Sequence, residues 1–143
     1  VSGWPAYYQI PSYHQLWINS DYFAKRVEFS EQLSNGITVN SFLLKADFIS
    51  YTNQFSDPSD PNVVVSEAMN ELLGLPLSQA GQDYYKSILL SGQAQDYYWT
   101  DAWTALQSTP VGHPDYQMNY NVVNTRLLNF YTQLFKQAEF QLS

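Results

Sequence analysis

The sequence predicts an all-α fold, a bundle of five or six helices that follows an irregular, aromatic N-terminal arm. Three observations favour this fold. Helix start and stop signals recur along the chain, apolar residues near its end repeat at intervals of three and four, and residues 1–19 hold Gly and Pro without a helical period. With 143 residues, 45% of them hydrophobic, the chain can bury one core. We therefore expect an extended arm over residues 1–19 and one helical domain over residues 20–143.

The first helix is expected over residues 21–33. Ser20 can cap it, because a serine hydroxyl accepts a hydrogen bond from a free backbone amide, and Gly36 lies beyond its end. Residues 37–46 contain two short apolar runs. Runs of this length fit either short extended segments or the start of a buried helix, so both structures stay open here.

Two further helices follow in the middle of the chain. A short one is expected over residues 46–55, before a turn rich in Ser, Asp and Pro. The next helix has the stronger start, with Asp60 as its cap and Pro61 at its first position. It should run to Leu73 and stop at Gly74, with Val64, Ala68 and Leu72 on its inner side.

The second half predicts three more helices. Ser78 can cap a helix that runs to Leu90, and Asp96 opens an aromatic helix that reaches about Leu106. The last helix is expected over residues 119–140, because its apolar residues recur at the spacing of a core-facing stripe. That stripe comprises Val123, Leu127, Phe130, Tyr131, Leu134 and Ala138.

The charge balance bears on the partners of the protein. The formal net charge is −7, and only six residues are Lys or Arg. Nucleic acids and anionic membranes both require clustered basic residues, so we expect neither as a partner. The longest apolar runs are also far shorter than a membrane span, so we expect no membrane insertion.

Composition gives a weaker indication of location. The chain has no cysteine, which fits both reducing and oxidising compartments. Few lysines and many Asn, Gln, Ser and Tyr residues lean towards an exported protein. The chain opens on Val1, with neither an initiator Met nor a signal peptide, and we interpret it as the interior of a longer protein.

Aromatic residues supply the candidate binding sites. They make up 17% of the chain, against 13% for charged residues. Tyr and Trp combine a large apolar body with a polar tip, so they serve in cores and on binding surfaces alike. Trp99 and Trp103 share a helix face, which is typical of a core stripe, whereas the adjacent Tyr97 and Tyr98 cannot both be buried. Tyr97 and Tyr98 are therefore candidate contact residues.

The N-terminal arm is the better binding candidate. An irregular backbone usually lies on the surface, where its polar groups meet water. Its rings either pack into the bundle, which we favour, or face outward to bind a ligand. The candidate residues are Trp4, Tyr7, Tyr8, Tyr13 and Trp17.

Catalytic and metal-binding signals are missing from the sequence. His14 and His113 have no spacing that indicates a metal site, and the Asp57–Asn62 segment lacks the glycine and distal glutamate of a calcium loop. Two carboxylate pairs lie along helix faces, at residues 28 and 31 and at residues 67 and 71, where solvation explains them. No serine-hydrolase elbow or phosphate loop is present, so we predict no catalytic residue and no cofactor.

Three blocks together resemble one known family. They are residues 1–9 with His14 and Trp17-Ile18-Asn19-Ser20, residues 98–103 (Tyr-Trp-Thr-Asp-Ala-Trp), and residues 123–127 with 138–142. The chain resembles the carboxy-terminal part of the bacterial family called domain of unknown function 1800, in its Bacteroidetes form. The resemblance implies a largely helical, exported or cell-surface protein several times longer than this chain. It implies no established activity and no catalytic residues.

These observations predict a non-catalytic interaction module that binds a glycan or a protein partner through its aromatic residues. Two alternatives stay open. The domain could be purely structural and pack against the N-terminal half of its own longer chain or a neighbouring subunit. It could instead be a fragment of a hydrolase-like enzyme, whose carboxylates act only with that half.

Overall fold

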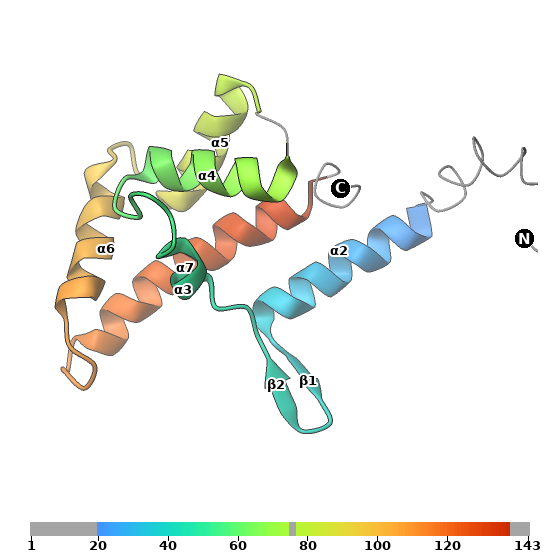
Figure 1. Cartoon of the computed structure of the whole chain (residues 1–143), viewed down its shortest axis with the longest axis horizontal. Coiled ribbons are helices and arrows are strands. Elements are labelled where there is room, and N and C mark those ends of the chain that lie inside the picture. The colour runs from blue at the N-terminus through green and yellow to red at the C-terminus, as the bar shows by residue number, and fades with distance from the viewer. Residues whose placement is uncertain (1–19, 75–76, 138–143) are drawn as a thin grey trace, which may run out of the picture.

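A computed structural model describes residues 20–74 and 77–137, which form six helices and one two-stranded sheet (Figure 1). The predicted mostly helical fold is confirmed. The arm at residues 1–19, with its five candidate binding residues, lies outside the described residues, as does Ala138. The elements are α2 (Ser20–Asn35), β1 (Ile37–Val39), β2 (Phe42–Leu44), α3 (Phe48–Thr52), α4 (Pro61–Leu73), α5 (Gln79–Leu89), α6 (Tyr97–Ser108) and α7 (Tyr116–Phe135).

Helix α7 is the centre of the fold. It packs against α2, α3, α5 and α6, and in Figure 1 it runs as the long red helix through the middle of the bundle. Full burial of one large apolar side chain contributes about 1.5–3 kcal/mol, so this stripe supplies much of the stability. The predicted stripe residues that the structure describes are all buried: Val123, Leu127, Phe130, Tyr131 and Leu134.

Two helices, α3 and α7, depart most from their predicted bounds. Helix α3 begins only after Asp47, whose side chain accepts a hydrogen bond from the Ser50 amide and caps the helix there. The segment predicted as a helix over residues 46–55 therefore forms a single short turn of helix. Helix α7 runs over Tyr116–Phe135, so it begins three residues and ends five residues earlier than predicted, with Asp115 at its N-cap position and Lys136 at its C-cap position.

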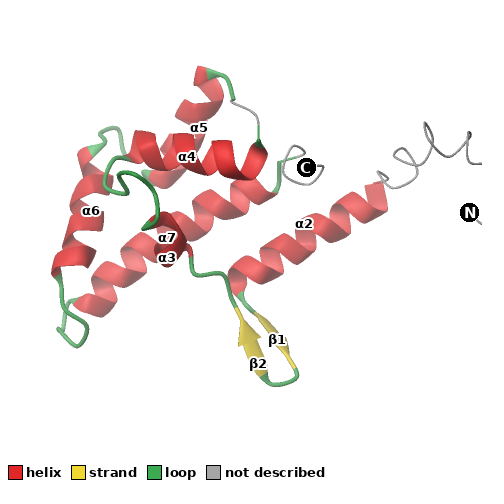
Figure 2. Cartoon of the chain, in the orientation of Figure 1, coloured by secondary structure: helices red, strands yellow, loops and turns green. Residues whose placement is uncertain are grey.

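Residues 37–44 form a β-hairpin, so of the two structures that the sequence left open the extended one is present. Strands β1 and β2 pair antiparallel, with Val39 opposite Phe42 and Ile37 opposite Leu44. The two residues between the strands have positive φ angles of 50° and 69°, as a two-residue type I′ turn requires. The hairpin projects away from the helices, at the C-terminal end of α2 (Figure 2).

The carboxylates on α4 hold the chain that precedes this helix. Glu71 accepts a hydrogen bond of 2.6 Å from the hydroxyl of Tyr51, and Glu67 accepts hydrogen bonds from the amide and hydroxyl of Ser56. Glu31, on α2, pairs with Lys136 at 2.6 Å. The prediction that solvation explains the carboxylates was therefore wrong for Glu31, Glu67 and Glu71, because each of these joins separate segments. The fourth, at residue 28, is exposed and accepts a hydrogen bond from Gln32 within α2.

Candidate binding groove and exposed tyrosine pair

The predicted contact residues Tyr97 and Tyr98 lie side by side at the start of α6. Their side chains are 53% and 37% exposed, and their ring centroids are 4.4 Å apart with planes inclined by 32°. Interaction with the side chain of Tyr98 raises the pKa of Tyr97. Arg126 of α7 donates a hydrogen bond of 2.9 Å to the carbonyl oxygen of Tyr98, which ties this end of α6 to α7.

Trp99 and Trp103 belong to the core, as the sequence predicted. Both are buried, and their ring centroids lie 5.6 Å apart. The indole N–H of Trp99 donates a hydrogen bond of 2.9 Å to the carbonyl of Pro58. The polar tip of this ring therefore fixes the loop before α4 and cannot serve a ligand.

A groove of about 420 Å³ opens at the other end of α6. It lies between the start of α3, the end of α6 and the start of α7, so residues 47–50 meet residues 106–120, which lie far from them in the sequence. Its volume falls within the range of about 300–1,000 Å³ typical of small-molecule sites. It is lined by Asp47, Ile49, Ser50, Leu106, Gln107, Thr109, Pro110, Val111, Tyr116 and Tyr120.

One wall of the groove is aromatic and apolar. Tyr116 and Tyr120 stand one helical turn apart on α7, with ring centroids 6.2 Å apart and planes inclined by 32°. Both side chains are half-buried, and Val111 beside them is strongly exposed. Rings held at this spacing by a helix present a preformed apolar surface to a ligand.

The lining also includes polar side chains from α3 and the end of α6. Hydrogen bonds from the Ser50 amide (3.0 Å) and hydroxyl (2.7 Å) hold the Asp47 carboxylate and lower its pKa. A carboxylate has about four acceptor positions, so Asp47 can accept further hydrogen bonds from a ligand. The hydroxyl of Thr109 is engaged by Ala105 and Asn119, whereas the Gln107 amide lies exposed. None of the described lining residues is basic.

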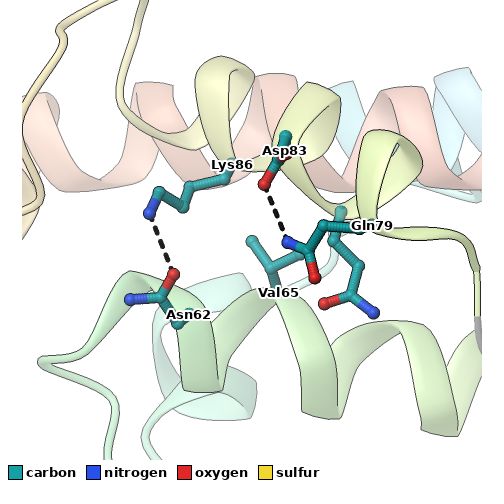
Figure 3. A pocket seen from close by; sticks show the side chains of 6 residues that line it. Asn62, Val65, Gln79, Asp83 and Lys86 are labelled. Carbon is teal, nitrogen blue, oxygen red and sulfur yellow. Dashed lines mark hydrogen bonds between the residues drawn. The ribbon is translucent and has the colours of Figure 1, made fainter.

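A second hollow, between α4 and α5, is too small for a ligand. Its volume is about 30 Å³, which suits one or two water molecules (Figure 3). Lys86 lies at its edge, pairs with Asp96 at 2.8 Å and donates a hydrogen bond of 2.9 Å to Asn62. Asn62 in turn donates to Asp96 at 3.0 Å, so the cluster joins α4, α5 and the start of α6. We interpret it as a structural contact.

The described part of the chain contains neither a metal-ion cluster nor a membrane span. There, no three His, Cys, Asp or Glu residues are grouped so that they could hold a metal ion. None of the described helices has the length and apolar character that a bilayer crossing requires. No protein-family model, curated protein or solved structure matches this chain.

Sequence reasoning missed the groove. The spacing of Tyr116 and Tyr120 by four residues was an available signal, since such residues share a helix face. Tyr116 fell in the predicted loop and Tyr120 in the predicted last helix, so the two were not expected to share a helix face. Nothing in the sequence pairs them with Asp47, which lies about seventy residues earlier and meets them only through the packing of α3 on α7.

Proposed function

We propose that this chain is a non-catalytic interaction module that binds a neutral glycan in the groove between α3, α6 and α7. The observation that carries the proposal is the combination of two tyrosine rings with the acceptors of Asp47 and Gln107 in the lining of one groove of about 420 Å³. Sugar rings have an apolar face that stacks on aromatic rings and an edge of hydroxyls that donate hydrogen bonds. The groove offers both kinds of partner.

The charge of the groove favours a neutral ligand over an anionic one. Asp47 is the only carboxylic acid among the described lining residues, and its lowered pKa keeps it negative near neutral pH. None of these residues is basic, so a phosphate or carboxylate would meet the charge of Asp47 without an opposing positive charge. The net charge of −7 adds to that effect.

The wider parts of the proposal concern location and family. An exported or cell-surface protein related to domain of unknown function 1800 would meet polysaccharides, so a glycan site suits that location. The exposed pair Tyr97 and Tyr98, at the far end of α6, would contact a protein partner and take no part in holding the sugar. Within the described residues, the carboxylates of α4 are engaged in holding other segments, which favours a binding role over hydrolysis.

A glycan array and a pull-down on insoluble polysaccharides test the proposal, followed by titration calorimetry with each sugar retained. Changing both Tyr116→Ala and Tyr120→Ala should weaken binding roughly 5- to 150-fold, because stacking on each ring contributes about 0.5–1.5 kcal/mol. Asp47→Asn should also weaken sugar binding, because it removes the negative charge of the acceptor. Asparagine can still cap α3, so the variant should keep its fold.

The matched control is the double change of Tyr97→Ala and Tyr98→Ala, which removes two exposed rings from the other end of α6. Circular dichroism must show that each variant keeps its helical content. Retention of no sugar by the parent chain would refute glycan binding. Loss of binding in the control variant alone would move the site to the start of α6.

A further inference from the structure

Arg126 is a half-buried cation that pairs with no carboxylate of the described residues. Its guanidinium donates one hydrogen bond, of 2.9 Å, to the carbonyl oxygen of Tyr98. The other half-buried cations of the described chain, Lys86 and Lys136, each form an ion pair with a carboxylate. A guanidinium has five N–H donors, so most of those of Arg126 remain for another acceptor.

The lack of an acidic partner for Arg126 is unusual in this chain. The sequence holds 13 Asp and Glu residues against six Lys and Arg residues, so acidic partners are abundant. Burial removes water from the guanidinium and lowers the pKa of Arg126. A cation that loses water is normally compensated by a carboxylate in contact with it. The site is therefore complementary in charge to a carboxylate that a partner would bring.

The exposed tyrosine pair lies at the same end of the α6–α7 contact as Arg126 (Figure 1). Arg126 binds the start of α6, whereas Asn119 donates a hydrogen bond of 3.4 Å to the Ala105 carbonyl further along α6. The two helices therefore run in opposite directions along their contact. This arrangement brings the exposed Tyr97 and Tyr98 to the part of α7 that carries the guanidinium.

Exposed apolar side chains continue from Arg126 along α7. Met118 and Val122 precede Arg126 by two helical turns and one, so the three share one side of the helix. Both apolar side chains are exposed. Together with Tyr97 and Tyr98 these three residues form what we call the Arg126 surface, whose part on α7 is about 12 Å long. Tyr and Arg are the residue types that most often dominate the binding energy of protein interfaces.

We propose that the Arg126 surface binds a segment of a partner protein that carries one Asp or Glu side chain flanked by apolar residues. This partner is the one proposed above for Tyr97 and Tyr98, so the inference rests on that proposal and adds the chemistry of the partner. The carboxylate would accept two parallel hydrogen bonds from the guanidinium. The flanking side chains would cover Met118, Val122 and the tyrosine rings.

The charges favour a carboxylate over a phosphate group. The guanidinium of Arg126 balances a single negative charge, whereas a phosphorylated side chain carries about −1.5 to −2 at pH 7. The Arg126 surface contains no second cation, since Lys86, near the start of α6, is paired with Asp96. Asp101, one turn after Tyr97 on α6, adds a negative charge that opposes a dianion.

Selection from a phage library of random twelve-residue peptides tests the proposal. Peptides that the parent chain retains and the Arg126→Gln variant does not are collected and sequenced. Glutamine can still donate to the Tyr98 carbonyl, so this variant removes the charge and should keep the fold. We expect Asp or Glu next to apolar residues in most of the collected peptides. A set without this enrichment, or no retained peptide at all, would overturn the proposal.

A double-mutant cycle then locates the carboxylate. One selected peptide is synthesised with its acidic residue and with the matching amide, and fluorescence anisotropy measures the binding of each to the parent chain and to Arg126→Gln. Either change should weaken binding roughly 10- to 150-fold, as expected for hydrogen bonds to a charged group. Both changes together should cost little more than one, because they break the same contact. Additive losses would place the carboxylate elsewhere and overturn the proposal.

Two further variants serve as controls. Arg26→Gln removes an exposed arginine from α2 and should leave peptide binding unchanged, so an equal loss in this variant would reduce the effect to net charge and overturn the proposal. Val122→Ser leaves the hydrogen bond from Arg126 to Tyr98 in place and should weaken binding severalfold. It therefore keeps the test decisive if circular dichroism shows that Arg126→Gln loses helical content.

Analytical ultracentrifugation separates a foreign partner from a second copy of the chain. Self-association that Arg126→Gln abolishes would show that a second copy supplies the carboxylate and would overturn the choice of a foreign partner. Arg126 does not line the groove between α3, α6 and α7, so Arg126→Gln should leave sugar binding unchanged. Peptide binding and sugar binding can therefore fail independently of each other.

Discussion

The buried hydrogen bond between Thr52 and Tyr131 gives the sharpest test of the packing. Their oxygens lie 2.8 Å apart, both side chains are fully buried, and the bond joins α3 to the central helix α7. Tyr131→Phe removes one partner but keeps the ring, which stacks on Phe48 at 4.7 Å. It leaves the threonine hydroxyl buried without a partner, which costs about 1–3 kcal/mol. Thr52→Val leaves the tyrosine hydroxyl in the same position and should cost a similar amount.

The double variant should cost much less than the sum of the two single changes, because it removes both polar groups together. We expect a coupling energy of about 1–2 kcal/mol, within the range found for residues in direct contact. The measurement is urea unfolding followed by tryptophan fluorescence and circular dichroism, with the slope of the transition as a control for the denatured state. Additive effects of the two changes would refute the argument that this bond joins α3 to α7.

Two further predictions concern the core and the charged cluster. Leu127→Ala should lower the free energy of unfolding by about 2–5 kcal/mol, because this side chain is fully buried. The matched change Leu128→Ala removes a half-buried side chain and should lower it clearly less. Urea unfolding measures both variants, and equal losses would contradict the packing. The hydrogen bond from Lys86 lowers the pKa of Asp96. The Lys86–Asp96 pair therefore stabilises the fold fully above the ordinary aspartate pKa of about 3.9, and this stabilisation is lost as the pH falls through the lowered pKa. At pH 7, Asp96→Asn should lower the free energy of unfolding by less than about 1 kcal/mol, because the Asp96 side chain is 42% exposed. At acidic pH the unfolding midpoint of the variant should approach that of the parent chain. A difference in midpoint that stays constant with pH would exclude the ion pair as its cause.

The elements that the sequence predicted well are those with local signals. Asp60 accepts a hydrogen bond from the Asn62 amide, Pro61 opens α4, and Gly74 ends it with a φ of 66°. Each of these features depends on a few neighbouring residues, so the sequence contains all the information needed. The long stripe on α7 is equally local, because its period is set by the helix itself.

The structure of residues 37–46 could not be predicted in this way. Short apolar runs fit a strand or a helix, and the turn between these strands uses Asn40 and Ser41 where Asn-Gly is the usual signal. The groove was missed for a related reason. Its walls come from three segments, and their meeting depends on how α3 and α6 pack on α7. Such tertiary contacts leave no mark at a fixed sequence spacing.

The polar tips of the aromatic residues separate structural rings from candidate contact rings. The indole N–H of Trp99 is engaged by Pro58, and the hydroxyl of Tyr131 by Thr52, so these rings hold buried segments together. Burial raises the pKa of Tyr131, which keeps its hydroxyl protonated as a partner for threonine. Tyr116 and Tyr120 instead line an open groove with their faces partly accessible. An aromatic-rich composition therefore serves two purposes in this chain, and the partner of each polar tip distinguishes them.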